Sequence, residues 1–125
     1  MDDPKGWVRP AAAGALESTV SSHPKRSPVS ETPLMAVPRV DIDDERLRVT
    51  EWRFAPGAQT GHHRHGFDYV VVPLTDGMLR LETPDGPVMA ELKAGRSYSR
   101  LQGVEHNVIN AGPGELAFVE IEYKR

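Results

Sequence analysis

Between residues 39 and 125, apolar side chains tend to alternate with polar ones in short segments that turn-forming residues separate. Alternation with a period of two is typical of β-strands, because successive side chains point to opposite faces of a sheet. We find no amphipathic helical pattern of useful length. The expected strands are residues 46–54, 68–74, 78–83, 88–92, 97–99, 105–110 and 116–123. Many short strands at this spacing predict a β-sandwich or barrel.

Three of the expected strands carry further information. The strand 46–54 changes its alternation near Thr50, which predicts a bulge or bend there. The strand 68–74 is apolar on both faces, so we expect it to be covered on both sides, with Pro73 near its end or at a sheet edge. In the strand 116–123, Glu120 and Glu122 share one face, and the other face consists of Ala117, Val119, Ile121 and Tyr123.

The first 38 residues differ in composition from the rest of the chain. They contain six of the eleven prolines and seven Ser or Thr residues, without a sustained hydrophobic period. Such a segment buries too little apolar surface to offset its ordering entropy, so we expect a flexible arm at 1–38 and one folded domain at 39–125. The arm is either an inert tail or a segment that wraps a partner subunit through Trp7 and Val8. A third alternative is that translation starts at Met35.

Length and composition restrict the class of protein. The chain has 125 residues, which suits one domain, and its net charge of −3 gives no electrostatic basis for binding nucleic acid. It contains no Cys, so any metal must be held by His and oxygen ligands. No apolar run approaches the roughly 18–20 residues of a membrane span. The start of the chain, with Asp2 and Asp3, is unlike a signal peptide. We therefore expect a cytoplasmic protein that does not bind membranes.

Three His residues, His62, His63 and His65, lie close together directly before a strand pattern. In an extended chain, positions i and i+2 face the same side about 6.6–7 Å apart, so the side chains of His63 and His65 can reach one metal ion. His62 has the opposite parity and is expected to face solvent or the mouth of a pocket. A third ligand must come from a distant strand. His106, in the strand 105–110, can supply it in a folded-over β architecture.

The spacing of these histidines and of several glycines resembles the two sequence motifs of the cupin family. The first motif matches Gly57-x5-His63-x-His65, with Gly77 as its closing glycine. The second matches Gly95-x5-Leu101-x-Gly103-x2-His106-x3-Asn110, with Leu101 where the family usually has Pro. The resemblance covers about residues 39–125. It implies an all-β fold, a small antiparallel jelly-roll barrel (double-stranded β-helix) that is often a homodimer, with a divalent metal inside.

The chain departs from the family pattern at one ligand position. The first motif usually continues to a glutamate, which would fall at Val70, or at Tyr69 under a shorter spacing. Asp68 shares strand parity with Val70, so it is either a fourth ligand or a hydrogen-bond partner of a ligand His. Solvent or substrate would complete the coordination of Fe(II), Zn, Mn or Ni. The expected metal ligands are therefore His63, His65 and His106.

Other residues near the motifs have several alternative roles. Tyr69, Tyr98 and Asp68 are the candidates for catalytic groups, although the two Tyr side chains suit a core or pocket wall unless a hydroxyl reaches the metal. Asn110 is expected to fix backbone or ligand geometry. One of four Arg side chains could turn inward and bind a substrate carboxylate: Arg53, Arg80, Arg96 or Arg100.

The resemblance leaves two functions open. Three neutral imidazoles leave the +2 charge of a divalent ion uncompensated, and such a centre attracts anionic substrates and acidifies bound water. Cupins with a three-His iron site include thiol dioxygenases, and residues 60–73 resemble the small cupins assigned to β-alanine catabolism. The first function is a metal-dependent oxygenase, isomerase or lyase that acts on a small anionic metabolite. The alternative is a non-enzymatic cupin that binds a small ligand or a metal.

Overall fold

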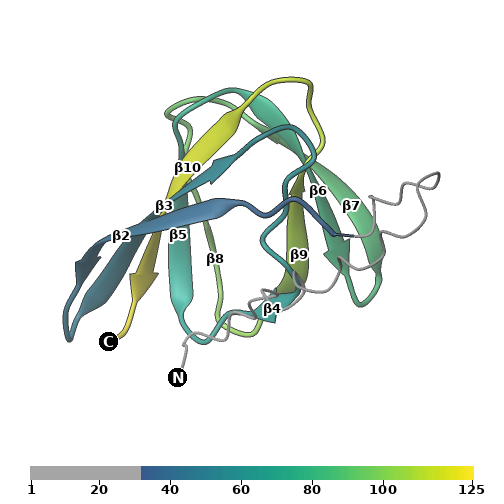
Figure 1. The fold of residues 1–125 in the computed structure, drawn as a ribbon. Coiled ribbons are helices and arrows are strands. Elements are labelled where there is room, and N and C mark those ends of the chain that lie inside the picture. Colours follow the sequence, from purple (N-terminus) through teal and green to yellow (C-terminus); the bar gives the residue numbers. More distant parts are fainter. Residues whose placement is uncertain (1–31) are drawn as a thin grey trace.

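The computed structural model describes residues 32–125, which form two β-sheets that face each other (Figure 1). Residues 1–31, with Trp7, Val8 and most of the expected arm, lie outside the described residues. In the described part of the chain, no helix is long and apolar enough to cross a membrane. The strands are β2 (Val37–Asp43), β3 (Leu47–Phe54), β4 (His63–Arg64), β5 (Asp68–Pro73), β6 (Gly77–Thr83), β7 (Gly86–Leu92), β8 (Tyr98–Arg100), β9 (Glu105–Asn110) and β10 (Leu116–Tyr123).

The order of strands in the two sheets shows how the chain folds over itself. One sheet has the order β2-β3-β10-β5-β8, and the other has the order β4-β9-β6-β7. Paired strands run antiparallel, and the last strand, β10, lies between the early strands β3 and β5. This is the antiparallel jelly-roll barrel that the sequence predicts, so the predicted fold class is confirmed.

The observed strands agree with the expected ones to within a few residues, apart from two additions. The sequence did not reveal β4, which has two residues, or β2, whose residues are all exposed and therefore show no buried face. The register between β2 and β3 shifts between Val40 and Ile42, opposite Thr50 and Val49. The irregularity expected near Thr50 is thus present, but the extra residue is Asp41 in β2.

The strand β5 lies inside its sheet, between β10 and β8. Its inner face is buried through Tyr69, Val71 and Pro73, and its outer face is half-buried at Val70 and Val72. The sequence predicted that both faces of this strand are covered, and the structure buries one face fully and the other in part. Pro73 is the last residue of the strand, which suits a residue without an amide hydrogen.

The core between the sheets is built around aromatic side chains. The ring centroids of Phe54 and Phe118 are 5.4 Å apart, and Trp52 packs against Phe54 at 6.3 Å. Full burial of each such side chain contributes about 1.5–3 kcal/mol relative to exposure. The closing glycine of the first motif belongs to this core, because a Cβ atom on Gly77 would lie 2.6 Å from Leu116 Cδ1. This close approach explains why a glycine is required there.

The inner face of β10 is the face that carries the two glutamates. Glu120 and Glu122 are buried together with Leu116 and Phe118, whereas Tyr123 on the opposite face is exposed. Period-two alternation showed which residues share a face, but it did not show which face lies inside. The barrel interior is therefore more acidic than the sequence suggested.

Asn110, at the end of β9, has the structural role expected for it. Its side-chain amide donates hydrogen bonds to the carbonyl oxygens of Gly114 at 2.8 Å, Phe54 at 3.2 Å and Ala55 at 3.3 Å. Its side-chain oxygen accepts a hydrogen bond from the Gly112 N–H at 2.9 Å. The residue thus joins three chain segments at one end of the barrel.

Candidate metal centre

Three His side chains converge inside the barrel from two strands and the segment after one of them. His63 on β4 lies directly opposite His106 on β9, and His65 follows β4 on the same side of the chain. All three are buried. The His65 Nε2 atom lies 3.1 Å from His63 Nε2 and 3.2 Å from His106 Nε2. The structure therefore brings together the three residues that the sequence selected as metal ligands.

The loop before β4 fixes the orientation of the His63 ring. The Gly61 carbonyl oxygen lies 2.9 Å from His63 Nδ1, and a carbonyl can only accept, so Nδ1 carries the hydrogen. In the neutral ring, Nε2 is then the nitrogen with a lone pair, and it faces His65 Nε2 at 3.1 Å. A partner that fixes the tautomer in this way is typical of a His that binds a metal.

The same loop is held in place from both sides. The Gln59 N–H donates to the Leu34 carbonyl at 3.0 Å, and the Ala36 N–H donates to the Gln59 carbonyl at 2.8 Å. On the other side, the Asn107 side chain accepts a hydrogen bond from the Gly61 N–H and donates one to Gln59 Oε1. The histidines therefore stand on backbone that is hydrogen-bonded to β9 and to the segment before β2.

The spacing of the three nitrogens fits a single ion. Two ligand nitrogens that each lie about 2.0–2.1 Å from one ion are roughly 3–3.4 Å apart at angles between about 90° and 110°. The two Nε2 separations of 3.1 and 3.2 Å fall in that range. Together with Nδ1 of His63 turned away toward Gly61, this donor set suits a divalent transition metal.

Burial keeps the three imidazoles neutral. Desolvation lowers the pKa of His63 to about 4 and the pKa of His106 to about 3. The pKa of His65 falls to about 2, first through desolvation and then through the neighbouring His63 and His106. Neutral imidazole is the form that binds a metal, so the cluster needs no deprotonation at neutral pH before an ion can enter.

Tyr69 occupies the position that the shorter motif spacing gives to a glutamate. Its ring stacks on the His65 ring with centroids 3.8 Å apart and planes at 17°. Burial raises the pKa of the Tyr69 hydroxyl above its ordinary value, so the hydroxyl stays protonated. Tyr69 therefore supports His65 sterically and supplies no carboxylate.

The structure does not bring Asp68 to the cluster. Its side chain is exposed, and Asp68 Oδ1 accepts a hydrogen bond from the Gln102 N–H at 2.8 Å. The odd-numbered residues of β5 point inward, so Asp68 and Val70 both point away from the histidines. The sequence argument paired these two residues correctly, but it assumed the wrong inward parity.

His62 faces outward, as its parity predicts. Its side chain is exposed and its Nε2 atom lies 2.9 Å from Glu105 Oε2. Among the four Arg candidates, Arg53 pairs with the largely buried Glu51 and Arg80 with Glu82. Arg96 is exposed as well. The remaining candidate, Arg100, lines the pocket described next.

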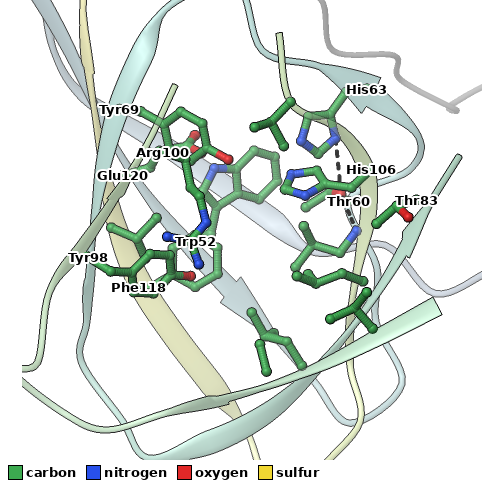
Figure 2. A pocket seen from close by; sticks show the side chains of 17 residues that line it. Trp52, Thr60, His63, Tyr69, Thr83, Tyr98, Arg100, His106, Phe118 and Glu120 are labelled. Atoms are coloured by element: carbon green, nitrogen blue, oxygen red, sulfur yellow. Dashed lines mark hydrogen bonds between the residues drawn. The ribbon is translucent and has the colours of Figure 1, made fainter. Parts of the chain in front are cut away.

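A pocket of about 250 Å³ lies beside the cluster (Figure 2). The picture shows His63 and His106 on one side, and Tyr69, Tyr98 and Arg100 on the other. The guanidinium of Arg100 lies 4.6 Å from the centre of the Tyr98 ring. The rest of the wall is mainly apolar and includes Trp52, Val71, Leu79, Leu81, Val88, Ala90, Val104, Val108 and Phe118. The pocket thus offers one cationic group and a hydrophobic interior.

Sequence reasoning missed one further residue of the site. Glu120 lines the pocket, and its Oε2 atom lies 3.9 Å from His65 Nε2. Its position in the sequence contained a usable signal, because it shares strand parity with Leu116 and Phe118. A Phe and a Glu on the same face of one strand indicate a buried carboxylate when that face is the inner one.

A scan against models of known protein families finds no match, but a search of individual proteins does. The chain is 65% identical over 89 residues to the β-alanine degradation protein BauB of Pseudomonas aeruginosa, which covers 71% of this chain and 94% of that protein.

Solved structures show the same fold. The crystal structure of a cupin domain from Bordetella pertussis superposes with a TM-score of 0.73 at 59% identity, over 74% of this chain and 97% of that one. An RmlC-like cupin with a double-stranded β-helix fold from Methanocaldococcus jannaschii has a TM-score of 0.62 at 16% identity, over 71% of this chain and 80% of that one. The second likeness concerns the fold alone.

Replacing His63 or His106 with Ala is expected to abolish metal retention, because each change removes one of three ligand nitrogens from a buried site. His62→Ala is the matched control, since His62 is adjacent in sequence but exposed, and it should retain close to the wild-type amount. Elemental analysis after incubation with Fe(II) or Mn(II) measures the difference. Equal losses in all three variants would contradict the assigned ligands, and a wild type with less than about 0.1 ion per chain would contradict the site itself.

The metal-free protein is expected to lose stability as the pH falls from 7 to 5. The folded-state pKa values of His63, His65 and His106 are lowered, so below about 6.5 the unfolded chain binds protons that the folded chain does not. Each of these groups then costs up to about 2 kcal/mol at pH 5.

Glu120 acts in the opposite direction. Burial raises its folded-state pKa to about 8, so its destabilising effect weakens as the pH falls toward 4.5. Three His contributions outweigh one Glu contribution of about 2–3 kcal/mol over this interval. Urea unfolding of chelator-treated protein at the two pH values measures the sum, and a free energy of unfolding that is higher at pH 5 would contradict the expectation.

Proposed function

The chain belongs to the cupin superfamily, and from this membership and its buried His cluster we propose that it is a metal-dependent enzyme of the oxygenase, isomerase or lyase type. The substrate would be a small anionic metabolite, and the protein would act in the cytoplasm. The observation that carries the proposal is the convergence of His63, His65 and His106 beside a pocket that contains a cationic side chain.

Arg100 supports an anionic substrate. It lines the pocket although its side chain is exposed, so it lies at the solvent-facing edge of the pocket. Its guanidinium stacks over Tyr98, and ion pairs within residues 32–125 use other Arg side chains. An Arg fork held in place by stacking is suited to bind a carboxylate with two parallel hydrogen bonds.

The apolar wall supports a substrate with a small hydrophobic body. Leu79, Leu81 and Val108 line the pocket on the sheet that also carries His63 and His106. A carboxylate held by Arg100 would thus have its carbon chain against this wall and its reacting atoms near the cluster. The buried walls also exclude water from those atoms, which strengthens every electrostatic interaction there.

A divalent ion in this cluster would supply Lewis acidity and, if it is iron, open positions for substrate and O2. The chain's own contribution is to hold three neutral imidazoles in place and to exclude solvent. His63 is fixed by Gly61, and His65 by the stacked Tyr69 ring. Tyr98, half-buried in the pocket wall, has a hydroxyl whose pKa is raised by burial, so it would act as a hydrogen-bond donor to the substrate.

A non-enzymatic binding protein is the second candidate. The observation in its favour is that Val70 and Tyr69 replace the usual glutamate of the first motif, so the cluster consists of three His residues. Such a protein would still bind an anion next to its metal but would release it unchanged. The name of the BauB relative, a β-alanine degradation protein, favours a role with small carboxylates in either case.

Iron-loaded protein is expected to consume O2 when it is offered its substrate from a panel of small carboxylates that includes β-alanine, thiol-containing acids and short-chain fatty acids. An oxygen electrode detects turnover, and product analysis without O2 consumption detects an isomerase or lyase. A carboxylate that binds tightly to the metal-loaded protein but is recovered unchanged would establish the binding protein instead.

The Arg100→Gln variant serves as the matched test of the anion site. It should weaken carboxylate binding by roughly 10–100-fold, because a charge-assisted bidentate contact is lost. It should leave metal content unchanged, because Arg100 is not one of the clustered ligands. The exposed Arg96→Gln is the control, and an equal effect of both changes would contradict a role for Arg100.

We also propose that the protein is a homodimer formed through β2. This strand is the outer edge of the five-stranded sheet, and all of its residues are exposed, including Val37, Val40 and Ile42. An exposed apolar edge strand favours pairing with another chain. A second copy of this chain would satisfy the free edge and cover these side chains, which helps a barrel of this size.

Light scattering at micromolar concentration is expected to give twice the mass of one chain. Val40→Lys should shift the protein toward the monomer, because it places a charge in the middle of the proposed contact. Leu101→Lys is the matched control, since Leu101 is 71% exposed but lies outside β2. A wild-type monomer, or equal dissociation by both changes, would contradict the β2 interface.

A further inference from the structure

The carboxylate of Glu120 is buried in the barrel with one oxygen unsatisfied. Its residue is 4% exposed on the inner face of β10. The Trp52 side chain hydrogen-bonds to the carboxylate, and Oε2 lies 3.9 Å from His65 Nε2. The other oxygen, Oε1, has no hydrogen-bond partner among the described residues. Figure 2 shows Glu120 in the pocket wall on the same side as Tyr69 and Trp52.

This arrangement is unfavourable for folding. Burial of a carboxylate without full hydrogen bonding disfavours its charged form strongly, and an apolar side chain would fill the same position at no such cost. The neighbouring Glu122 differs, because its Oε1 atom faces the guanidinium of Arg48 at 3.7 Å. Glu120 thus stands between an acidic neighbour and the His cluster, and the Trp52 hydrogen bond and the charge of Arg48 compensate its burial only in part.

We propose that Glu120 is the carboxylate ligand of the metal centre, supplied by β10 instead of by the first motif. The inference rests on the metal site of the proposed function. Two ligands of one ion, each about 2.0–2.2 Å from it, can lie up to roughly 4.2 Å apart, and the 3.9 Å between Glu120 Oε2 and His65 Nε2 is within that limit. The carboxylate does not lie within 4.8 Å of all three imidazoles, so the proposal requires its side chain to rotate toward the ion.

The strand register explains how a residue of β10 could take the role of the motif glutamate of β5. Glu120 pairs with Val71, and Glu122 pairs with Tyr69, so β10 lies directly beside the part of β5 that would carry the motif glutamate. The stacked ring of Tyr69 occupies the usual position. A carboxylate from the adjacent strand then lies next to His65, and on binding it would reduce the +2 charge of the ion by one.

The proposal predicts opposite effects of one substitution on metal binding and on folding. In Glu120→Gln, the affinity for Co(II) or Zn(II) should fall by at least roughly 10–100-fold, because loss of even an outer hydrogen-bond partner of a ligand typically costs that much. The metal-free variant should melt at a higher temperature than the wild type, because an unpaired buried carboxylate has been neutralised. A purely structural Glu would give the reverse: unchanged metal affinity with lower stability.

Glu122→Gln is the matched control. It changes the same residue type on the same face of the same strand, two positions away, and it should change the metal affinity less than about threefold. Competition against a chromophoric chelator measures both dissociation constants, and the visible spectrum of bound Co(II) should change in Glu120→Gln but not in Glu122→Gln.

Each outcome separates the inference from the proposed function. If the wild type binds no Co(II) or Zn(II), the metal site itself is absent and the inference falls with it. If the wild type binds metal and both Gln variants behave alike, the three-His site stands and Glu120 is not its carboxylate. Should Glu120→Gln fail to fold, Glu120→Asp keeps the charge on a shorter side chain, and an unchanged Co(II) spectrum in it would overturn the proposal.

Discussion

The pairing of β4 with β9 is the contact on which the rest of the site depends. Their register places His63 opposite His106, and these two residues are more than forty positions apart in the sequence. The pairing is only two residues long, so it cannot be stable alone. The loop before β4 compensates through hydrogen bonds that Asn107 makes with Gly61 and Gln59. The closed barrel around this short ladder then keeps the imidazoles away from water, and this isolation holds them neutral and ready for a cation.

Burying polar groups inside a small barrel costs free energy of desolvation, and two buried residues differ in how far hydrogen bonds offset it. Asn110 satisfies its amide completely with backbone partners, so its burial contributes to the fold. Glu120 does not, and its carboxylate destabilises the folded chain unless a positive charge comes close. The metal-free barrel is therefore held together mainly by Phe54, Phe118 and their neighbours, while the polar interior is adapted to an ion. A ligand that binds only the folded form, as an ion in this cluster would, stabilises that form.

The sequence predicted the barrel and the convergence of the three His residues for a common reason: alternation and spacing show which residues share a face of a strand. His63, His65 and His106 came together as expected because both motifs specify their spacing within short segments. Asp68, considered as a ligand or a partner of a ligand His, lies outside, and Glu120 was not singled out, both for the complementary reason. Period-two patterns fix parity but not which parity is inside, and a one-residue shift exchanges the two faces. On β10 alternation separated Glu120 and Glu122 from Val119 and Ile121 but did not show that the glutamates lie on the inner face. The strand β2 escaped notice because a fully exposed edge strand has no buried face to record.

The hydrogen bonds between the segment before β2 and the loop before β4 have a mechanical consequence. Leu34 and Ala36 clamp Gln59 through two backbone hydrogen bonds, and Gln59 is four residues before His63. A displacement at the start of the folded region would therefore reach the loop of the first His through these two hydrogen bonds and through Ala36, which is also part of the core. The segment from Leu34 to Ala36 is therefore part of the support of the His cluster, although it lies before the first described strand.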